Sequence, residues 1–358
     1  SVLLSSDLRP QNVTTWEVGA DLRFYQNRVG IDYSYYYINA TDQIFSVPLA
    51  ASTGFRSEYR NAGVLESRGH ELVFSFVPIR RGGFQWEVLT NFSKNDNMVV
   101  ELAPGVERIQ TGYQNFTSVG AFAYAGYEYP VIFGSSYMRD DDGRIVVDSR
   151  ETVAGQPNPF YGMPLAGPEK ILGNVNPDWD ASVTNTLSFK GLSLSAQFYY
   201  SKGGVISSGL TQLLRNYGCD IVTEDRDIPQ VLPNTAKGYI DPATGDLVLE
   251  GDNDIEILKG EDYWSTVQWN ITESTVFDKT MLRLKEVVVS YDMPQQWFAG
   301  TFISSLSLYL NGRNLALWTE YPNFDPESST AEGNGIGAFE YVSLPNTKSF
   351  GGGIKLTF

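Results

Sequence analysis

The sequence is poor in the residues that build disulfides, zinc sites and nucleic-acid interfaces. It has one cysteine, Cys219, and one histidine, His70, in 358 residues. A single cysteine excludes an internal disulfide, and a single histidine removes most histidine-based catalysis and most zinc sites. Only 26 Lys and Arg stand against 42 Asp and Glu, giving a net charge of −16. No basic patch is present that could neutralise phosphates, so nucleic acid is excluded as a partner.

Long hydrophobic runs are also missing. No stretch approaches the roughly 18 consecutive apolar residues of a membrane helix, so any membrane crossing has to be made by strands. The sequence contains no Gly-rich phosphate loop, nucleophile elbow or metal-ligand cluster, and it therefore predicts no catalytic residue and no metal-binding residue. Glycine and aromatic residues are abundant: 34 Gly, 21 Tyr, 20 Phe and 7 Trp. This composition favours β structure with tight turns and aromatic girdles.

Alternation of apolar and polar residues is the main structural signal. Over residues 16–24 every second residue is apolar or small, and the intervening positions hold Glu17, Asp21 and Arg23. The same alternation runs over residues 29–37 after a turn of about three residues, which predicts a β-hairpin. Because the charged residues are confined to one face, each strand has an apolar side and a polar side.

The pattern predicts nine strands in all. The seventh loses its alternation near Lys285 and Glu286, which indicates a β-bulge. The last strand ends on an aromatic residue, Phe358, as the last strand of an outer-membrane barrel commonly does. The terminal strand of a soluble β protein is the alternative for this segment taken alone. The predicted strands are 16–24, 29–37, 70–76, 84–92, 183–189, 192–200, 281–291, 306–310 and 350–358.

The connections between these strands alternate in length. The turns near 26–28, 78–83, 190–191 and 292–301 are short, and the connections at 47–63, 102–180, 203–280 and 317–348 are long. Short turns on one side and long loops on the other are typical of a bacterial outer-membrane barrel. We therefore predict an all-β protein, an antiparallel transmembrane β-barrel portion with long extracellular loops and short periplasmic turns.

Nine strands cannot close a bacterial barrel, which has an even number of strands. Counting back from the long last connection places Phe358 in the periplasm and Ser1 at the cell surface. An open sheet would leave two unpaired edges in lipid, which is prohibitively costly. We expect a second polypeptide to supply the missing strands, as cleavage in a surface loop of a longer protein would. A single full-length band on denaturing electrophoresis of protein from intact cells would contradict cleavage.

Six segments carry a family resemblance. Residues 8–19, and residues 61–63 with 67–72, are similar to late strands of TonB-dependent receptors. Gly173-Asn174-Val175-Asn176-Pro177-Asp178-Trp179 resembles the GN-x-NPDW segment of the SusC/RagA family, the nutrient importers of Bacteroidota outer membranes. Residues 282–287, 311–315 and 321–327 match the same family in the same order, so the resemblance covers nearly the whole chain.

The resemblance implies that residues 1–358 are the C-terminal part of a TonB-dependent receptor β-barrel, about nine strands of about 22, without its plug domain and N-terminal strands. It implies multi-pass insertion in the outer membrane of a Gram-negative bacterium and active import of oligosaccharides or oligopeptides. The implied partners are the N-terminal plug and barrel fragment, a SusD-like surface lipoprotein, TonB acting through the plug, and outer-membrane lipid. No cofactor is implied. The polar face would hydrate the channel and hold the plug with Glu17, Asp21, Arg23, Asp32 and Glu87.

Three other functions stay open at this stage. A passive outer-membrane porin would conduct without a plug or TonB. An outer-membrane enzyme would need a catalytic cluster. A soluble β-rich carbohydrate-binding protein would partition into buffer rather than detergent. The sequence does not distinguish a glycan substrate from a peptide substrate, because aromatic and acidic loop residues serve either.

Four aromatic residues of the long acidic loop are the predicted substrate or partner contacts: Tyr217, Tyr263, Trp264 and Trp269. Exposed aromatic rings stack on sugars, grip peptide side chains or anchor protein interfaces. Packing of one loop against another, or against a partner, is the favoured alternative for all four.

Acidic turns at 140–143 and 252–256 have carboxylates near the spacing of a calcium loop, but Ile257 stands where an EF-hand needs glycine. We predict solvated turns, with Ca²⁺ in an extracellular loop as the alternative. Asp178 has no assignable partner carboxylate for acid–base chemistry and is predicted to be structural. We expect His70 to be a surface or girdle residue near the outer end of its strand, and Cys219 to be buried or shielded in its loop.

Overall fold

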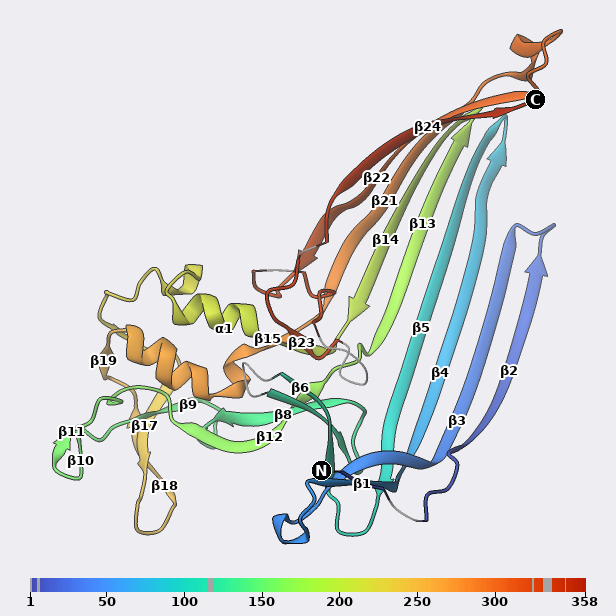
Figure 1. Cartoon of the computed structure of the whole chain (residues 1–358). Coiled ribbons are helices and arrows are strands. Elements are labelled where there is room, and N and C mark those ends of the chain that lie inside the picture. Colours follow the sequence, from blue (N-terminus) through green and yellow to red (C-terminus); the bar gives the residue numbers. More distant parts are fainter. Residues whose placement is uncertain (1, 5–6, 115–118, 324, 331–336, 345) are drawn as a thin grey trace.

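The computed structural model describes residues 2–4, 7–114, 119–323, 325–330, 337–344 and 346–358. It consists of a tall, curved antiparallel sheet with a group of folded loops at one end (Figure 1). Ser1, expected at the cell surface, lies outside the described residues. The described residues include no helix that is long and apolar enough to cross a membrane.

Nine strands form the curved sheet, which we call the wall, and each is hydrogen-bonded to its neighbour in sequence order. All nine predicted strands are confirmed. A short parallel strand, β1 (Val2–Leu4), pairs with the start of β4. The wall strands are β2 (Asn12–Phe24), β3 (Val29–Pro48), β4 (Ser57–Arg81), β5 (Phe84–Leu102), β13 (Trp179–Phe189), β14 (Leu192–Lys202), β21 (Met281–Asp292), β22 (Ser305–Thr319) and β24 (Ser349–Thr357).

Strands β3 and β4 extend further than predicted at the loop end. The connection expected at 47–63 is reduced to residues 49–56. The pairing of β3 with β4 shifts between Ala40 and Gln43, and Asp42 has a φ of 54°. A bulge changes which face the following residues occupy, so the alternation seen up to Tyr37 no longer identifies the strand beyond it.

The turn predicted at 78–83 is also shorter. Strand β4 passes through Val77 and Pro78 as a bulge between Phe76 and Ile79, and only Gly82 and Gly83 remain in the turn. Proline lacks a backbone N–H and is tolerated within a sheet at such bulges. The bulge is filled by Arg28, whose guanidinium donates hydrogen bonds to the carbonyls of residues 77 and 78.

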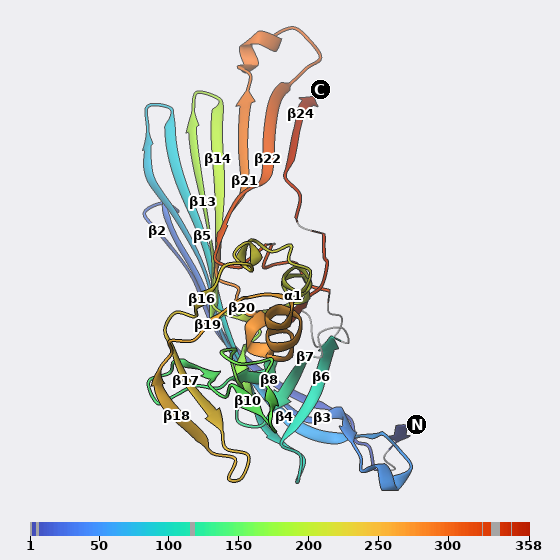
Figure 2. The ribbon, with the colours of Figure 1, turned by 90° about the vertical axis from the view of Figure 1, so that its left-hand side faces the viewer.

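Short turns and long connections lie at opposite ends of the wall (Figures 1 and 2). The turns 25–28, 82–83, 190–191 and 293–304 share one end, where the chain ends at Phe358. The connections 49–56, 103–178, 203–280 and 320–348 share the other end. The predicted segregation is confirmed for the three longest connections, whereas the 49–56 connection, with 8 residues, is shorter than the 12-residue turn 293–304. We call the first end the turn end and the second the loop end.

The three longest connections fold into what we call the loop assembly. Three apolar clusters form its cores: one around Trp264 and Val147, one that packs Ile109 against Phe45 and Val99 of the wall, and one around Ile132. The elements are β6 (Arg108–Gln114), β7 (Val119–Tyr124), β8 (Val131–Tyr137), β9 (Ile145–Asp148), β10 (Thr152–Val153), β11 (Gln156–Pro157), β12 (Ala166–Asn174), β15 (Val205–Ser208), α1 (Gly209–Asn216), β16 (Gln230–Val231), β17 (Thr235–Ile240), β18 (Leu247–Asp252), β19 (Glu256–Ile257), β20 (Val276–Asp278) and β23 (Phe339–Glu340), with the short helical turns η2 (Ile221–Thr223), η3 (Asp262–Gln268) and η4 (Thr272–Thr275). The 49–56 connection holds only the helical turn η1 (Ala51–Thr53).

One face of the wall is apolar across neighbouring strands. The register aligns Leu187 with Leu194, Leu194 with Val289, and Val289 with Leu310, so a row of aliphatic side chains crosses four strands. These side chains are exposed despite their character. We call this face the outer face, and its exposure is what a lipid-facing barrel surface requires.

Candidate functional site

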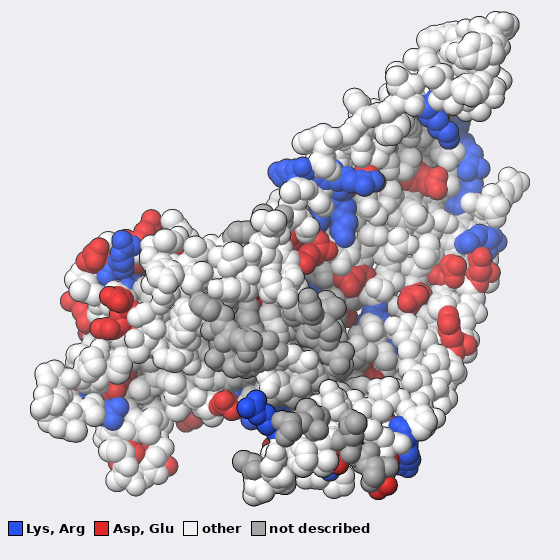
Figure 3. All heavy atoms as spheres, in the orientation of Figure 1, with Lys and Arg blue, Asp and Glu red and all other residues white. Residues whose placement is uncertain are grey.

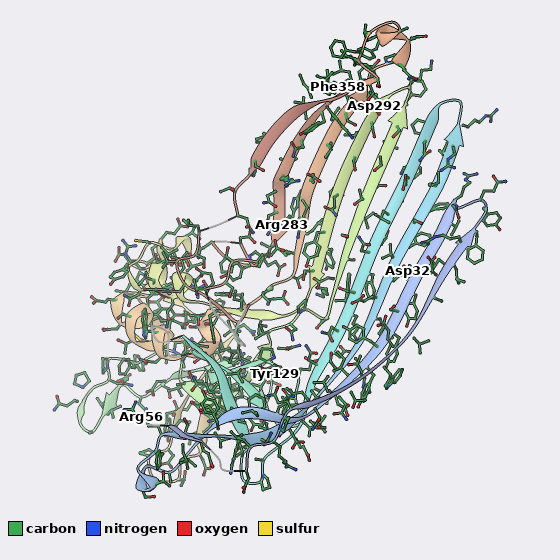
Figure 4. The ribbon with its side chains drawn as sticks, turned by 45° about the vertical axis from the view of Figure 1, so that its right-hand side comes forward. Asp32, Arg56, Tyr129, Arg283, Asp292 and Phe358 are labelled. Carbon is green, nitrogen blue, oxygen red and sulfur yellow. The ribbon has the colours of Figure 1, made fainter. Side chains whose placement is uncertain are left out.

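The opposite, inner face of the wall carries the polar residues predicted for the channel. Asp21 lies directly across from Asp32, and Glu87 across from Thr186. Figure 3 shows acidic and basic side chains along this side of the strands, and Figure 4 labels Asp32 midway along the sheet. Arg23 forms an ion pair with Asp21 at 3.1 Å on the same face. The predicted polar face is thus continuous from strand to strand.

A bulge in β21 brings two consecutive charged residues to the inner face. Against β14, the register of β21 shifts between Leu284 and Glu286, which leaves Lys285 as the extra residue. The Lys285 ammonium lies 4.1 Å from the centre of the Tyr199 ring, and Glu286 accepts a hydrogen bond from Arg313 at 2.7 Å. Lys285 and Glu286 line one polar hollow of about 410 Å³. The predicted bulge is confirmed, and its effect is to concentrate charge at the loop end of the inner face.

Arg283, two residues earlier, is nearly fully buried and joins the wall to a loop. Its guanidinium donates to Asp325 and lies 2.9 Å from Glu327, both in the β22–β24 connection. Burial alone would raise the pKa of Asp325, but hydrogen bonds from Arg283, from the Glu327 backbone N–H and from Asn346 hold that pKa below its usual range. The remaining hydrogen-bonding capacity of such a buried pair affects its stability; it is satisfied at Asp325, whereas the Arg283 Nε is buried and meets no acceptor among the described residues.

These contacts fasten the 320–348 connection to the inner side of β21. Lys285 adds a second ion pair to Glu327 at 3.5 Å. Two of the segments that carried the family resemblance, 282–287 and 321–327, therefore meet in space. Phe324, which belongs to the second segment, lies outside the described residues. Figure 4 shows Arg283 at the loop end of its strand, far from Asp292 and Phe358 at the turn end.

A groove of about 500 Å³ lies in the loop assembly beside α1 and η3, and we call it the α1–η3 groove. Its lining includes Tyr217, Arg226, Glu261 and Trp264. Tyr217 is 71% exposed, whereas Trp264 is 8% exposed. The indole N–H of Trp264 is buried and meets no acceptor within the part of the chain that the structure describes. A lining of aromatic side chains with a few polar groups is the usual composition of a site for a small polar ligand.

The four predicted aromatic contacts fall into two groups. Tyr217 and Trp264 line the groove, and Tyr263 and Trp269 are not part of its lining. Tyr263 stacks edge-on against Trp264 with ring centres 4.8 Å apart in a loop core, and its burial raises its pKa to about 12. Trp269 is half-buried, and its carbonyl accepts a hydrogen bond from Gln212. Tyr263 and Trp264 both pack in a loop core, and Trp264 also borders the groove. Substrate contact by the four residues stays a prediction.

The acidic turns are tied together by basic residues. Arg144 forms ion pairs with Asp140 at 2.8 Å and Asp252 at 2.6 Å, and Lys237 pairs with Asp254 at 2.6 Å. Among the described residues, no group of three or more His, Cys, Asp and Glu could hold a metal ion. A calcium ion at these turns stays an untested alternative.

The two rare residues lie in different settings. His70 is on the outer face, where its Nδ1 is 2.8 Å from the Tyr33 hydroxyl and its ring is 4.9 Å from that of Tyr35. It lies near the middle of β4 and not near the strand end as expected, because β4 extends back to Ser57. Cys219 was expected to be buried but is exposed. The backbone N–H of Cys219 donates to the Leu214 carbonyl at the end of α1, and this turn directs the side chain outward.

Sequence reasoning missed the residues that hold the loops in place. Arg283 and Asp325 could have been found, because both lie in the quoted motifs and carry opposite charge. Glu340, which is fully buried and accepts a hydrogen bond from the Ser208 hydroxyl at 2.8 Å, had no such signal. Ser208 also caps α1 by accepting from the backbone N–H of Thr211.

Comparison with known proteins identifies the wall. The family described as "TonB dependent receptor-like, beta-barrel" matches residues 3–315. The chain belongs to the TonB-dependent receptor β-barrel family. TonB-dependent receptor P3 of Formosa agariphila is 26% identical over 96% of this chain, and TonB-dependent receptor SusC of Bacteroides thetaiotaomicron is 28% identical over 28% of it. The resemblance inferred from the motifs is confirmed.

Solved structures agree with this receptor fold. The structure of the RagAB peptide transporter covers 97% of the chain with a TM-score of 0.68 at 21% identity, which shows the fold. This receptor chain spans 34% of the length of the P3 relative and 35% of the RagAB chain. The wall is therefore a part of an outer-membrane receptor barrel, with the outer face toward lipid and the inner face toward the lumen.

Proposed function

We propose that this chain forms the C-terminal part of the wall of an active importer that takes up nutrient oligomers across the outer membrane. The observation that carries the proposal is the inner face, where a continuous polar surface meets a loop fastened by Arg283 to Asp325 and Glu327. A hydrated wall with loops fixed over its outer end suits controlled passage of a large polar solute.

Transport energy would come from TonB through the plug of the complete receptor. The chain itself would perform no bond chemistry. A SusD-like lipoprotein at the loop end is the expected extracellular partner, in line with the resemblance to SusC and RagA. The protein would lie in the outer membrane of a Gram-negative bacterium of the Bacteroidota, as the Formosa and Bacteroides relatives suggest.

The α1–η3 groove is our candidate first contact for the substrate, with Tyr217 as its exposed aromatic residue. An oligosaccharide or an oligopeptide fits this chemistry, because a tyrosine ring stacks on sugars and on peptide side chains. RagAB is described as a peptide transporter, and an oligopeptide is therefore the first substrate to try.

Uptake of labelled oligomers by cells tests the proposal. Tyr217→Ala should lower uptake at limiting substrate, and Tyr25→Ala is the matched control because Tyr25 is an exposed tyrosine in a turn at the opposite end. Loss of TonB should abolish uptake of the same oligomers in cells that carry the unaltered receptor. Uptake that persists without TonB would instead identify a passive porin.

A further inference from the structure

The turn between β21 and β22 differs from the other turns at its end of the wall. Residues 293–304, Met-Pro-Gln-Gln-Trp-Phe-Ala-Gly-Thr-Phe-Ile-Ser, contain no charged residue. The other three turns contain or adjoin a basic residue, Arg28, Arg81 or Lys190, whereas the charged residue that adjoins this turn is acidic, Asp292. Figure 3 shows the tip formed by this turn without acidic or basic atoms, and Figures 1 and 2 show it projecting past the ends of the strands. We call residues 293–304 the aromatic turn.

Large apolar side chains of the aromatic turn are exposed. Trp297 is 62% exposed and Phe302 is 80% exposed, and the short helical turn η5 (Gln295–Phe298) contains no buried residue. Exposed apolar groups on a projecting segment are costly in water, so they indicate an apolar partner.

The backbone of the aromatic turn is folded on itself. The N–H of Trp297 donates to the carbonyl of Pro294 at 3.0 Å, and the N–H of Thr301 donates to the carbonyl of Phe298 at 2.9 Å. The Thr301 hydroxyl donates to the same Phe298 carbonyl and accepts from the N–H of Ile303. Internal hydrogen bonds lower the cost of bringing a backbone near lipid, where unsatisfied polar groups are expensive.

The aromatic turn continues the outer face of the wall. The Phe302 ring lies 6.3 Å from the ring of Phe358. Phe358 is 80% exposed and follows Ile354 and Leu356, which belong to the outer face with Leu308 and Leu306 across the ladder. The surface that faces lipid along the strands therefore extends without a charged break onto the turn.

We propose that the aromatic turn is an interfacial lipid anchor, with Trp297 and Phe302 lying among the phospholipid headgroups and upper acyl chains of the leaflet at the turn end. Tryptophan suits this position because its ring has an apolar body and a polar N–H. The anchor fixes the depth of the β21–β22 hairpin in the membrane. The proposal rests on the outer-membrane location of the family and does not depend on the transported substrate.

Fluorescence of Trp297 in lipid vesicles tests the anchor. The complete receptor would be placed in phosphatidylcholine vesicles, with and without bromine atoms on the acyl chains, and the spectrum of Trp297→Phe would be subtracted from that of the unaltered protein. The difference isolates Trp297. We expect a blue-shifted emission that loses most of its intensity in brominated lipid and is insensitive to iodide in the water.

Trp86→Phe provides the matched control, because Trp86 lies on the outer face and its emission should be quenched by brominated lipid. Quenching of Trp297 by iodide and not by brominated lipid would place the turn in water and overturn the anchor. Resistance to both quenchers would also overturn it, because the turn would then be covered by protein.

Discussion

In the loop assembly, apolar side chains such as Val147, Ile257 and Trp264 pack against one another, whereas in the wall apolar side chains such as Leu194 and Leu310 point outward. The first arrangement is that of a small globular domain in water. The second makes sense only if lipid covers one face and the remaining strands of the barrel cover the edges. The same chain thus has one region built for water and one built for lipid, and the two regions meet through polar pairs such as Arg283 with Asp325 and through an apolar cluster that joins Phe45 to Ile109.

Breaking the polar junction between the two regions should have the largest effect. Arg283→Met removes the cation but leaves Asp325 buried, which should cost about 3–5 kcal/mol of local stability because an unpaired buried charge remains. Hydrogen exchange in residues 320–348 should rise sharply. Arg313→Met is the control, since its pair with Glu286 is largely exposed and should contribute only about 0–1 kcal/mol. Equal exchange in both variants would contradict a fastening role for Arg283.

Removing a loop-core side chain should unfold one region without the other. Trp264→Ala deletes a large buried ring and should cost the loop assembly about 3–5 kcal/mol. Faster hydrogen exchange is expected in residues 221–280, with the wall strands unchanged. Tyr217→Ala, in the same groove but exposed, should change stability by no more than about 0.5 kcal/mol. If hydrogen exchange in the wall strands also becomes faster, the two regions unfold as one cooperative unit and the expectation is wrong.

Substituting arginine on each face of the wall should distinguish the lipid-facing side from the lumen-facing side. Leu194→Arg places a guanidinium in lipid and should cost up to about 2–4 kcal/mol, depending on depth. Ser195→Arg, at the next position on the inner face, should be tolerated. Thermal unfolding of the purified receptor measures both variants, and similar losses would contradict the assignment of the faces.

A half-buried lysine at the junction should give an effect that is confined to high pH. Burial lowers the pKa of Lys279 from 10.5 to about 8, against the opposing influence of Asp180. Between about pH 8 and 10.5 the unfolded chain therefore binds more protons, so the free energy of local unfolding should rise with pH in that window. Below it the slope should vanish. Lys279→Met should abolish the slope, as measured by hydrogen exchange of residues 276–280, and an unchanged slope would assign the effect to another group.

The wall could be predicted from sequence because the alternation within each strand separates its apolar face from its polar face. Alternation over residues 16–24 and 192–200 fixes both the strand and the side that meets lipid. Prediction stopped at the bulges near Asp42 and Pro78, where the two-residue period breaks. The bulge at Lys285 was predicted, because the alternation visibly breaks at the consecutive charged residues Lys285 and Glu286.

The loop assembly was far less predictable. Its cores join distant residues, such as Val147 with Trp264 and Phe45 with Val99, and short strands carry too few residues to show a period. Loop packing was the favoured alternative for the four aromatic residues, and Tyr263 and Trp264 are mostly packed inside, whereas Cys219, expected inside, is exposed. Composition indicates that a loop is rich in aromatics, but tertiary packing decides which of them face water.

The most direct test of the account is the reactivity of two neighbouring cysteines in β14. Leu194→Cys and Ser195→Cys would each be made in receptor in which Cys219 and any other cysteine are replaced, then treated in membranes with a charged, water-soluble thiol reagent and with a lipid-soluble one. We predict that the cysteine at 194 reacts only with the lipid-soluble reagent and that the cysteine at 195 reacts with the water-soluble one. Equal reaction of both positions with the water-soluble reagent would contradict a wall that separates lipid from lumen.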